Sequence, residues 1–315
     1  MNNHEAAIVL EGVTKKYGDF TAVSEVNLSV PKGAIYGFLG PNGAGKTTTI
    51  RMILDIVKPT AGRITVLGED SALKVRNRIG YLPEEKGLYK KMKAWAIIAY
   101  FARLKGLSAK DAKLRAYELL EQYGLKDFAN ARCETLSKGM GQKVQVLASI
   151  AHNPEFVILD EPFSGLDPAN QQVMESVVRD LRKRGATVVF STHVMSHAER
   201  MCDRILLIAK AKKIFDGTIP EARKLIPRRV RVGGQTPEVL SRLPGVASVA
   251  AFASEDASAA TRWDLILADG ADPQELLRHC FRAGLELDSF EQYEPTLHDV
   301  FLQLVGEGAK VASFR

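Results

Sequence analysis

Hydrophobic residues in the first 225 positions occur in short runs, in one weak alternation with polar residues, or at helical spacing. The short runs predict strands at residues 7–10, 34–39, 64–67, 156–159 and 187–190, and the alternation predicts a strand at residues 23–30. The last two runs are apolar throughout, which is typical of strands buried on both faces of a parallel sheet. Elsewhere apolar residues recur every three or four positions, which predicts helices at residues 47–54, 92–123 and 144–151.

The pattern changes after residue 225, where Pro227 and the pair Gly233-Gly234 precede a tail with its own order of elements. The tail predicts strands at 229–232, 246–252, 263–267 and 285–290, helices at 237–243 and 273–283, and a loop at 254–260. This βαββαβ order indicates a small split-βαβ sandwich of about 80 residues, followed by a last helix over 296–304. We therefore expect one domain over residues 1–226 and an accessory domain over residues 227–315.

The length of 315 residues agrees with two domains. Hydrophobic residues make up 46% and charged residues 25%, which favours a sizeable core over global disorder, collagen-like repeats or an all-charged coiled coil. Lys and Arg exceed Asp and Glu by 43 − 37 = 6. This excess fits a polyanionic ligand, an acidic membrane face or nucleic acid, and does not choose between them.

Cysteine usage and the apolar runs narrow the cellular setting. The three cysteines are widely separated and form no CxxC pair, which argues against a disulfide scaffold or a thiolate zinc site and favours a reducing compartment. Residues 1–10 hold no basic leader followed by an apolar core, so no secretory signal is expected. The longest apolar run, residues 94–102, is shorter than the roughly 20 residues of a membrane-spanning helix. We therefore expect a cytoplasmic chain that does not itself cross a membrane.

Residues 40–47 match the pattern GxxxxGK[ST] and lie between a predicted strand and a predicted helix, as a phosphate-binding loop requires. The loop consists of Gly40, Pro41, Asn42, Gly43, Ala44, Gly45, Lys46 and Thr47. Its glycines allow backbone N–H groups to turn toward phosphate oxygens, and the helix N-terminus adds a favourable partial charge. Lys46 can reach the β- and γ-phosphates, and the Thr47 hydroxyl can ligate Mg²⁺. A glycine-rich turn that binds nothing fits this context poorly.

Asp160 and Glu161 directly follow the apolar strand predicted at residues 156–159. Because that strand would end at the carboxyl edge of the sheet, we expect Asp160 beside the phosphate loop, where it can hold Mg²⁺ through water. Glu161 lies one residue further and is placed to accept a proton from an attacking water. Adjacent acidic residues at the end of a strand often have no role beyond being polar residues where the strand ends. This interpretation therefore depends on the presence of the phosphate loop.

Further motifs follow in the order of a known family. Residues 136–140 (LSKGM) resemble the LSGGQ signature of the ABC-type ATPases, and residues 164–167 (SGLD) resemble their D-loop. His193 resembles the switch histidine of that family, and Tyr17 resembles the aromatic residue that stacks on adenine. Residues 8–225 are therefore similar to an ABC-type ATPase.

The resemblance implies an α/β fold, namely an ABC-type P-loop nucleotide-binding domain with a mixed sheet, an antiparallel β part and a helical lobe over about residues 85–136. The small α+β tail domain would follow it. The resemblance also implies ATP hydrolysis by a pair of such domains, with ATP held between the phosphate loop of one copy and the signature of the other.

The same resemblance assigns roles to individual residues. Beyond the phosphate loop, nucleotide contacts are implied for Tyr17, Thr48, Ser137 and Gly139. The implied Mg²⁺ ligands are Thr47, Glu84 and Asp160, and the implied catalytic residues are Glu161 and His193.

Two of these roles have ordinary alternatives. Tyr17 could be a strand-end aromatic, and His193 could be a core histidine. His193 and His197 are spaced like a zinc-binding pair, but Val194 stands where the HExxH motif requires Glu, so the zinc interpretation fails. We expect His193 to form a hydrogen bond with the γ-phosphate.

The sequence departs from the family pattern at three positions. Lys138 and Met140 stand where Gly and Gln are usual in the signature, so polar contacts that Gln would make across the dimer are lost. Ser137 and Gly139, which would meet the γ-phosphate, are retained. Glu84 stands where the family usually has Gln, and a carboxylate can still ligate Mg²⁺ or hold a water. Hydrolysis is therefore expected to persist.

Residues 80–89, 136–140 and 294–302 further resemble a branch of the family that serves exporters of sodium, antibiotics or other small solutes. In that branch a separate transmembrane permease binds the transported solute, and the helical stretch at residues 90–123 would grip the permease's cytoplasmic helix. The implied cofactors are ATP and Mg²⁺. The implied partners are the permease and a second ABC ATPase subunit, in a homodimer, on the cytoplasmic face of the cell membrane, and no nucleic acid is expected.

A soluble ABC ATPase that acts on ribosomes or nucleic acid is the alternative. Such proteins usually carry two nucleotide domains in one chain or a long coiled coil, whereas this sequence has one phosphate loop and no sustained heptads. A non-hydrolysing regulatory module is disfavoured because Lys46, Asp160 and Glu161 are all present.

Overall fold

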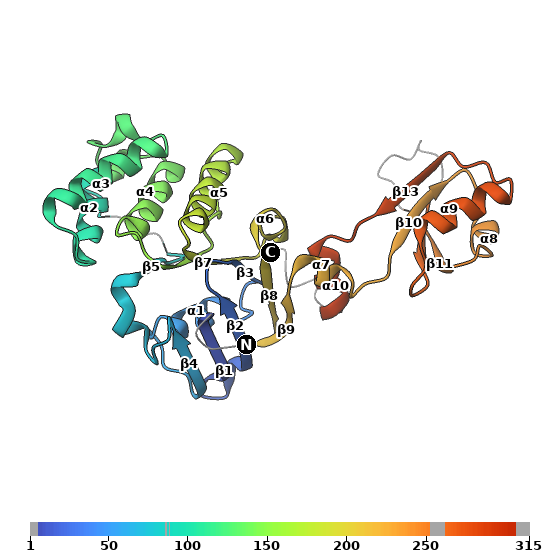
Figure 1. Ribbon diagram of the computed structural model, residues 1–315, viewed down its shortest axis with the longest axis horizontal. Coiled ribbons are helices and arrows are strands. Elements are labelled where there is room, and N and C mark those ends of the chain that lie inside the picture. Colours follow the sequence, from blue (N-terminus) through green and yellow to red (C-terminus); the bar gives the residue numbers. More distant parts are fainter. Residues whose placement is uncertain (1–5, 86, 88, 253–261, 307–315) are drawn as a thin grey trace. The chain divides into compact units, whose positions relative to one another are not determined.

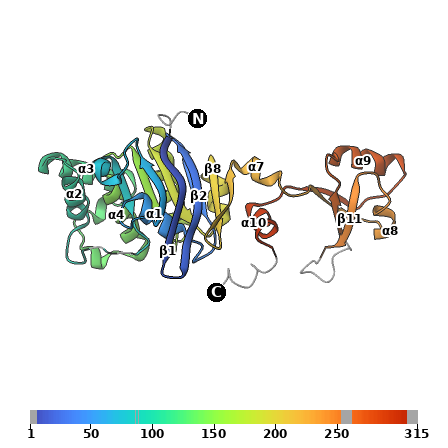
Figure 2. The same cartoon turned by 90° about the horizontal axis from the view of Figure 1, so that it is seen from below.

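The computed structural model in Figures 1 and 2 describes residues 6–306 except 86, 88 and 253–261. The described chain forms two compact units, with the division between Ile219 and Pro220. Residues 220–226, which the sequence prediction assigned to the first domain, belong to the second unit. The loop predicted at residues 254–260 lies outside the described residues.

The centre of the first unit is a mixed sheet. Within the described residues its strands lie in the order β5 (Ile79–Leu82), β6 (Phe156–Asp160), β7 (Thr187–Thr192), β3 (Ile35–Leu39), β8 (Arg204–Ala209) and β9 (Lys212–Gly217). The neighbouring strands from β5 to β8 are parallel, and β9 is antiparallel to β8. Every residue of β3, β6 and β7 is buried, as the uninterrupted apolar runs predict. The hairpin β8–β9 and strand β5 are additions to the predicted strands.

A smaller antiparallel sheet lies against this centre. Within the described part of the chain it contains β2 (Phe20–Pro31), β1 (Ala6–Tyr17) and β4 (Ala61–Val66), in that order. β1 and β2 extend beyond their predicted bounds because they pair with each other along nearly their whole length. In β2, buried and exposed residues alternate from Val26 to Val30, so one face of the sheet packs on the core.

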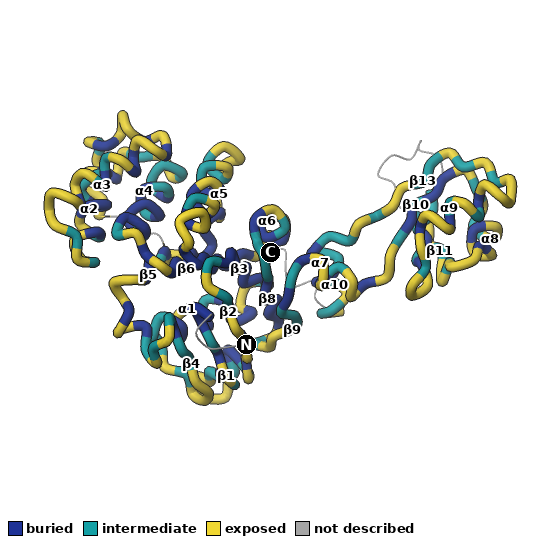
Figure 3. Tube along the Cα trace, viewed as in Figure 1, coloured by how far each residue is buried: buried dark blue, intermediate teal, exposed yellow. Residues whose placement is uncertain are grey.

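Helices cover both faces of the central sheet (Figure 1). One face carries α4 (Lys138–Ile150), α5 (Pro168–Lys183) and α6 (Met195–Met201), and the other carries α1 (Lys46–Ile53) and the antiparallel sheet. Two clusters of buried apolar side chains correspond to these two faces. Figure 3 shows the buried residues concentrated along the central strands and the facing sides of the helices. The sheet edge that carries the site is therefore held between two packed layers.

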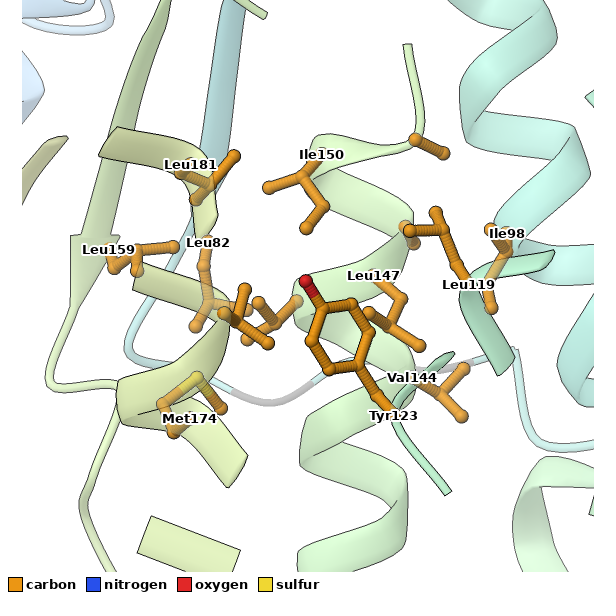
Figure 4. Packing of buried hydrophobic residues seen from close by; sticks show 14 of the residues in the cluster. Leu82, Ile98, Leu119, Tyr123, Val144, Leu147, Ile150, Leu159, Met174 and Leu181 are labelled. Carbon is orange, nitrogen blue, oxygen red and sulfur yellow. The ribbon is translucent and has the colours of Figure 1, made fainter. Parts of the chain in front are cut away.

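The helical lobe packs against the α4 and α5 side of the core. It contains α2 (Ala94–Leu104), α3 (Ala109–Gln122) and short 3₁₀ turns at Lys126–Phe128 and Cys133–Thr135. The helical pattern predicted over residues 92–123 is thus interrupted, because Gly106 has a φ of 105° and Ser108 caps α3. Figure 4 shows side chains of α4, α5 and the central sheet around Tyr123, whose burial raises the pKa of its hydroxyl to about 12.

Helix α4 begins six residues before its predicted start at residue 144. Ser137 is its N-cap, and the Ser137 hydroxyl accepts a hydrogen bond of 3.3 Å from the Met140 N–H. Residues 136–140 therefore form the N-terminus of a helix. The first turn contains two glycines, Gly139 and Gly141, which are poor helix formers and have no apolar side chain. The spacing of apolar residues therefore did not detect this start.

In the second unit the predicted βαββαβ order is confirmed. Its described elements are β10 (Arg229–Gly233), α8 (Pro237–Leu240), β11 (Val246–Ala251), β12 (Arg262–Leu267), α9 (Pro273–Arg282) and β13 (Ser289–Tyr293). The strands form an antiparallel sheet in the order β11-β12-β10-β13, so the first and last strands of the tail are neighbours. Val230, Val232 and Leu265 pack with Leu276 and Cys280 of α9 in the core of this unit.

The strand predicted at residues 285–290 is wrong in its position. Leu285 and Leu287 pack against the core of the second unit, and this apolar alternation is what the sequence pattern detects. They lie before the ladder, however, because β13 pairs with β10 only from Ser289 to Tyr293.

The remaining helices are α7 (Ile219–Arg223), at the division between the units, and α10 (Leu297–Val305). α10 starts with a capping box, in which Thr296 and Asp299 each accept a hydrogen bond from the other's backbone N–H. A short 3₁₀ segment, Ala72–Arg78, precedes β5 in the first unit. Among the described residues no helix combines the length and the hydropathy that spanning a bilayer requires.

Candidate functional site

The phosphate loop connects β3 to α1 at the carboxyl edge of the central sheet. Two of its glycines leave no room for a side chain. A Cβ on Gly40 would lie 2.1 Å from the Ile208 carbonyl oxygen, and a Cβ on Gly45 would lie 2.5 Å from the Ala22 carbonyl oxygen. Gly45 also has a φ of 108°, a conformation that favours glycine. The loop therefore packs tightly against β8 and β2 and exposes its backbone to the opposite side.

Lys46 is buried at the base of this loop. Its ammonium donates hydrogen bonds to the carbonyl oxygens of Gly40 at 2.8 Å and Pro41 at 3.2 Å, and lies 3.8 Å from a Glu161 carboxylate oxygen. Burial lowers the pKa of Lys46, and the nearby carboxylates of Glu161, Asp160 and Glu84 oppose that shift. Lys46 is therefore a cation held inside the loop and balanced by acidic groups.

Asp160 ends β6 next to the first turn of α1. One of its carboxylate oxygens accepts hydrogen bonds from the hydroxyls of Ser191, in the adjacent β7, and Thr47, the latter at 3.4 Å. The other oxygen, Oδ2, is buried and has no hydrogen-bond partner among the described residues, although the Asp160 side chain is only 1% exposed. An unpartnered buried carboxylate oxygen beside a hydroxyl is a donor set that suits a hard cation such as Mg²⁺.

Glu161 lies one residue beyond β6 in a left-handed conformation, with φ at 49°. Its backbone N–H donates a hydrogen bond of 2.9 Å to the Ser191 hydroxyl, which anchors this turn. Both carboxylate oxygens lie 3.0 Å from His193 Nδ1, and His193 follows β7. Burial raises the pKa of Glu161, while the contacts with His193 and Lys46 oppose that shift. In this structure His193 therefore contacts the carboxylate of Glu161.

The phosphate loop and Glu161 line one cavity of about 450 Å³, a size suited to a small-molecule ligand, whereas Asp160 and His193 are not among its lining residues. The residues that line it are Phe20, Ala22, Asn42, Gly43, Ala44, Gly45, Lys46, Thr47, Thr48, Glu84 and Glu161. Three segments distant in the sequence thus meet at one edge: the phosphate loop with α1, the turn after β5 and the turn after β6. Parallel strands bring their carboxyl ends to the same edge, which explains this meeting.

The hairpin between β1 and β2 places an aromatic residue that sequence reasoning missed. Phe20 lines the cavity, whereas Tyr17, the predicted adenine-stacking residue, is not among the lining residues. The two residues are paired across a two-residue turn at Gly18 and Asp19. The turn-forming pair Gly-Asp between two strand-like runs is the signal that would have paired Phe20 with Tyr17.

The signature residues lie apart from this cavity. Ser137 and Gly139, at the start of α4, are not among its lining residues. Gly139 packs instead against the start of α5, where a Cβ on Gly139 would lie 2.6 Å from the side-chain amide nitrogen of Asn170. Asp167, the last D-loop residue, caps α5 by accepting a hydrogen bond of 2.8 Å from the Asn170 N–H. Within one copy, therefore, the signature joins the D-loop rather than the phosphate loop.

Models of two known protein families match different parts of the chain. The family model described as ABC transporter matches residues 23–164, and the model described as ATP-binding protein DrrA1-3-like, C-terminal domain, matches residues 217–305. The first match contains the phosphate loop and the Asp160–Glu161 pair, and the second covers the sheet and helices of the second unit.

Among the relatives that match almost the whole chain are proteins from two bacteria. The Bacillus subtilis (strain 168) protein named uncharacterized ABC transporter ATP-binding protein YhaQ is 37% identical over 299 residues, which is 95% of this chain and 98% of that protein. The daunorubicin resistance ATP-binding protein DrrA3 of Streptomyces coeruleorubidus is 35% identical over 316 residues, 98% of each chain. The similarity therefore includes the second unit.

A solved structure resembles the first unit. It is described as the dimeric structure of a post-hydrolysis state of an ATP-binding cassette bound to ADP and Pi. The similarity has a TM-score of 0.62 at 27% sequence identity, and covers 67% of this chain and 98% of that one.

Proposed function

Because this chain belongs to the ABC transporter ATP-binding proteins, we propose that it is the ATPase subunit of an exporter that drives a separate transmembrane permease. The observation that carries this proposal is the convergence of Lys46, Thr47 and Glu161 on one cavity beside a glycine-rich loop, with Asp160 in contact with Thr47. The relatives and the structure described above are transporter ATP-binding proteins or ATP-binding cassettes, which favours a transporter over a soluble ATPase that acts on ribosomes or nucleic acid.

The phosphates of ATP would occupy the cavity. Backbone N–H groups of residues 42–48 and the N-terminus of α1 are suited to phosphate oxygens. The Lys46 ammonium would exchange its contacts with the Gly40 and Pro41 carbonyls for contacts with the β- and γ-phosphates. The burial of Lys46 strengthens such a contact because little water competes for the charge.

The donor set beside Lys46 fits Mg²⁺. Thr47 and Asp160 would hold the ion, with the unpartnered Asp160 Oδ2 as a hard oxygen ligand and Glu84 at the cavity wall as a further acidic group. When bound, Mg²⁺ neutralises charge on the phosphate oxygens.

Glu161 is the group best placed to orient the attacking water and accept its proton, since its carboxylate lines the cavity. His193 contacts both oxygens of that carboxylate, so it holds Glu161 in position and can pass from Glu161 to the γ-phosphate when ATP is present. Ser191 supports both acidic residues, because it donates to Asp160 and accepts from the Glu161 N–H.

We infer that the working form is a pair of chains. Ser137 and Gly139 lie outside the cavity of their own chain, and they would complete the cavity of a partner chain when ATP closes the pair. The dimeric cassette structure supports this arrangement. A homodimer needs no second gene product and is the simplest form.

The permease would dock on the helical lobe at the cytoplasmic face of the cell membrane. Exposed apolar residues gather there, including Tyr89, Tyr100 and Leu104, with the Tyr89 and Tyr100 rings in edge-to-face contact. Export of an antibiotic or another small solute is supported by the resistance function in the name of DrrA3.

ATP hydrolysis by the purified full-length chain, alone and with its membrane partner, tests the ATPase proposal. Lys46→Ala should reduce turnover by at least about 100-fold, because it removes the cation that meets the transferred phosphate. Lys183→Ala, at an exposed lysine of α5, is the matched control and should keep the wild-type rate. Normal turnover in Lys46→Ala would refute the site.

Isolation of the tagged chain from gently solubilised native membranes tests the transporter proposal. A polytopic membrane protein in near-equal amount is the expected companion. Recovery of the chain from the soluble fraction with ribosomes or nucleic acid would leave the ATPase site intact and refute the role in transport.

A further inference from the structure

Phe20 is a large apolar side chain at the rim of a cavity whose other walls are mostly polar. Its side chain is 65% exposed, although the residue begins a strand of the antiparallel sheet. Phe20 and Ala22 both line the cavity, so the start of β2 forms one of its walls. An exposed aromatic ring that faces into a ligand cavity is a surface that a flat apolar group would cover.

The position of Phe20 along β2 sets its distance from the phosphate loop. Ala22 lies directly against the loop, since its carbonyl oxygen is 2.5 Å from where a Cβ on Gly45 would stand. Phe20 lies two residues further along the strand, or about 7 Å. A nucleotide whose phosphates fill the loop must therefore extend its nucleoside end along the wall that Phe20 forms.

Tyr17 lies across the hairpin from Phe20 and has a different environment. Residues paired in an antiparallel ladder point to the same face, so the two rings belong to one side of the hairpin. One side of the Tyr17 ring, however, carries the Lys15 ammonium at 4.9 Å from its centroid. The same ammonium donates a hydrogen bond of 2.8 Å to the Lys58 carbonyl oxygen, so Lys15 is held in place on that ring. Phe20 therefore offers the ring that faces the cavity itself.

We propose that Phe20 contacts the base of the nucleotide directly, as a second aromatic residue beside Tyr17, and so contributes to affinity for the nucleoside part of the ligand. This inference rests on the proposed nucleotide site. Stacking on an aromatic face needs only a π-surface, so the contact serves any purine base and does not select adenine over guanine. The phosphate contacts, by contrast, belong entirely to the loop.

Equilibrium binding of two probes to the full-length chain separates these contributions. The probes are ATP, which has a base, and inorganic tripolyphosphate, which has none. Phe20→Ala should weaken ATP binding by about tenfold, equivalent to about 1.4 kcal/mol, and leave tripolyphosphate binding unchanged. GTP binding should weaken to the same extent as ATP binding. Phe128→Ala, at an exposed phenylalanine of the helical lobe, is the matched control and should change neither affinity.

A second variant gives a direct spectroscopic signal. Phe20→Trp keeps an aromatic ring at the site, so it should retain ATP affinity, and its indole fluorescence should change when ATP binds but not when tripolyphosphate binds. Unchanged ATP affinity in Phe20→Ala, or equal weakening of ATP and tripolyphosphate, would overturn the role of Phe20. If the wild-type chain bound neither ATP nor tripolyphosphate, the nucleotide site on which the inference rests would be overturned instead.

Discussion

Glu161 is a buried carboxylate whose protonation state decides whether it can act as a base. Burial raises its pKa, and the contacts with His193 and Lys46 limit that rise. The neighbouring acidic residue Asp160 is held differently, by hydroxyl donors from β7 and α1. Two adjacent carboxylates thus have different surroundings, which suits one for proton transfer and the other for a cation.

The raised pKa of Glu161 predicts the acid side of the pH profile for hydrolysis. Because the residue accepts protons only when ionised, kcat should fall as the pH drops through this raised pKa, at a higher pH than for an ordinary glutamate. Glu161→Gln should reduce kcat by about 100-fold or more while ATP binding persists. Steady-state rates between pH 5 and 8 in wild type and variant provide the measurement. If kcat of the Glu161→Gln variant fell at low pH as strongly as kcat of the wild type, another group would be responsible for that fall.

Residues whose chemistry depends on local spacing were predictable from the sequence. The phosphate loop, Asp160 and Glu161 belong to contiguous motifs, and the structure brings them to one cavity or its immediate border. Ser191 and Phe20 were missed because their roles depend on register: Ser191 faces Asp160 across β6 and β7, and Phe20 faces Tyr17 across a hairpin. A pairing register is a relation between strands and is absent from any single window of sequence.

At the scale of elements, local capping groups decide where several helices begin. Ser108, Ser137, Asp167 and Thr296 each accept a backbone hydrogen bond at a helix N-terminus. Such caps satisfy N–H groups that would otherwise have no partner. They also explain the early start of α4, which apolar periodicity alone placed too late.

The capping box of α10 should contribute measurably to the stability of the second unit. Thr296→Val keeps the shape of the side chain but removes the hydroxyl that accepts the hydrogen bond from the Asp299 N–H. This substitution should lower the free energy of unfolding by about 1 kcal/mol. Chemical denaturation of the full chain, monitored through the transition of the second unit, provides the measurement. Thr236→Val is the matched control, since Thr236 is the N-cap residue of α8 without a side-chain cap bond. Equal losses of unfolding free energy in Thr296→Val and Thr236→Val would exclude a specific contribution from the capping box.

His152 joins the end of α4 to the start of β5. Its Nε2 lies 3.1 Å from the Ile79 carbonyl oxygen, which also accepts a hydrogen bond of 3.1 Å from Lys105 at the end of α2. Burial, with the nearby Lys105 charge, lowers the pKa of His152 from 6.5 to about 4. The junction between the helical lobe and the central sheet therefore contains a neutral imidazole at physiological pH.

This lowered pKa predicts a loss of stability in acid. Between about pH 6.5 and pH 4 the unfolded chain binds a proton at His152 that the folded chain does not, so stability falls as the pH drops through this range. His152→Gln should therefore reduce the difference in Tm of the first unit between pH 7 and pH 5. The same substitution at His279, in the second unit, should leave that difference unchanged. If the Tm of His152→Gln changed with pH as much as the Tm of the wild type, His152 would not be the source of the loss of stability in acid.

At the scale of the whole molecule, the phosphate loop and the signature residues do not meet within one chain. The phosphate loop, Glu84 and Glu161 line the cavity, whereas Ser137 and Gly139 do not. In the proposed dimer a second copy would bring its signature to this cavity, and the resemblance to a dimeric cassette supports that arrangement. The second unit adds a sheet and helices that match a family domain of their own.

Glu161→Gln should therefore trap a dimer when ATP and Mg²⁺ are added. ATP still binds in this variant but is hydrolysed slowly, so the closed pair accumulates and light scattering should report a doubling of mass. Adding Lys46→Ala to the same chain should abolish the dimer, because the phosphates lose their buried cation. A monomeric Glu161→Gln chain that hydrolyses ATP at the full rate would contradict the model.

The buried strands β3, β6 and β7, the phosphate loop, the acidic pair and the βαββαβ order of the tail can be derived from residue order alone, because each depends on spacings of a few residues. Strand β5, the hairpin β8–β9 and helices α5 and α6 were not predicted from the sequence. Three features required the folded chain. They are the meeting of the loop with Glu84 and Glu161, the placement of Phe20 rather than Tyr17 at the cavity wall, and the separation of the signature from the cavity. Each depends on strand order, pairing register or burial, which arise only when segments far apart in the chain pack together.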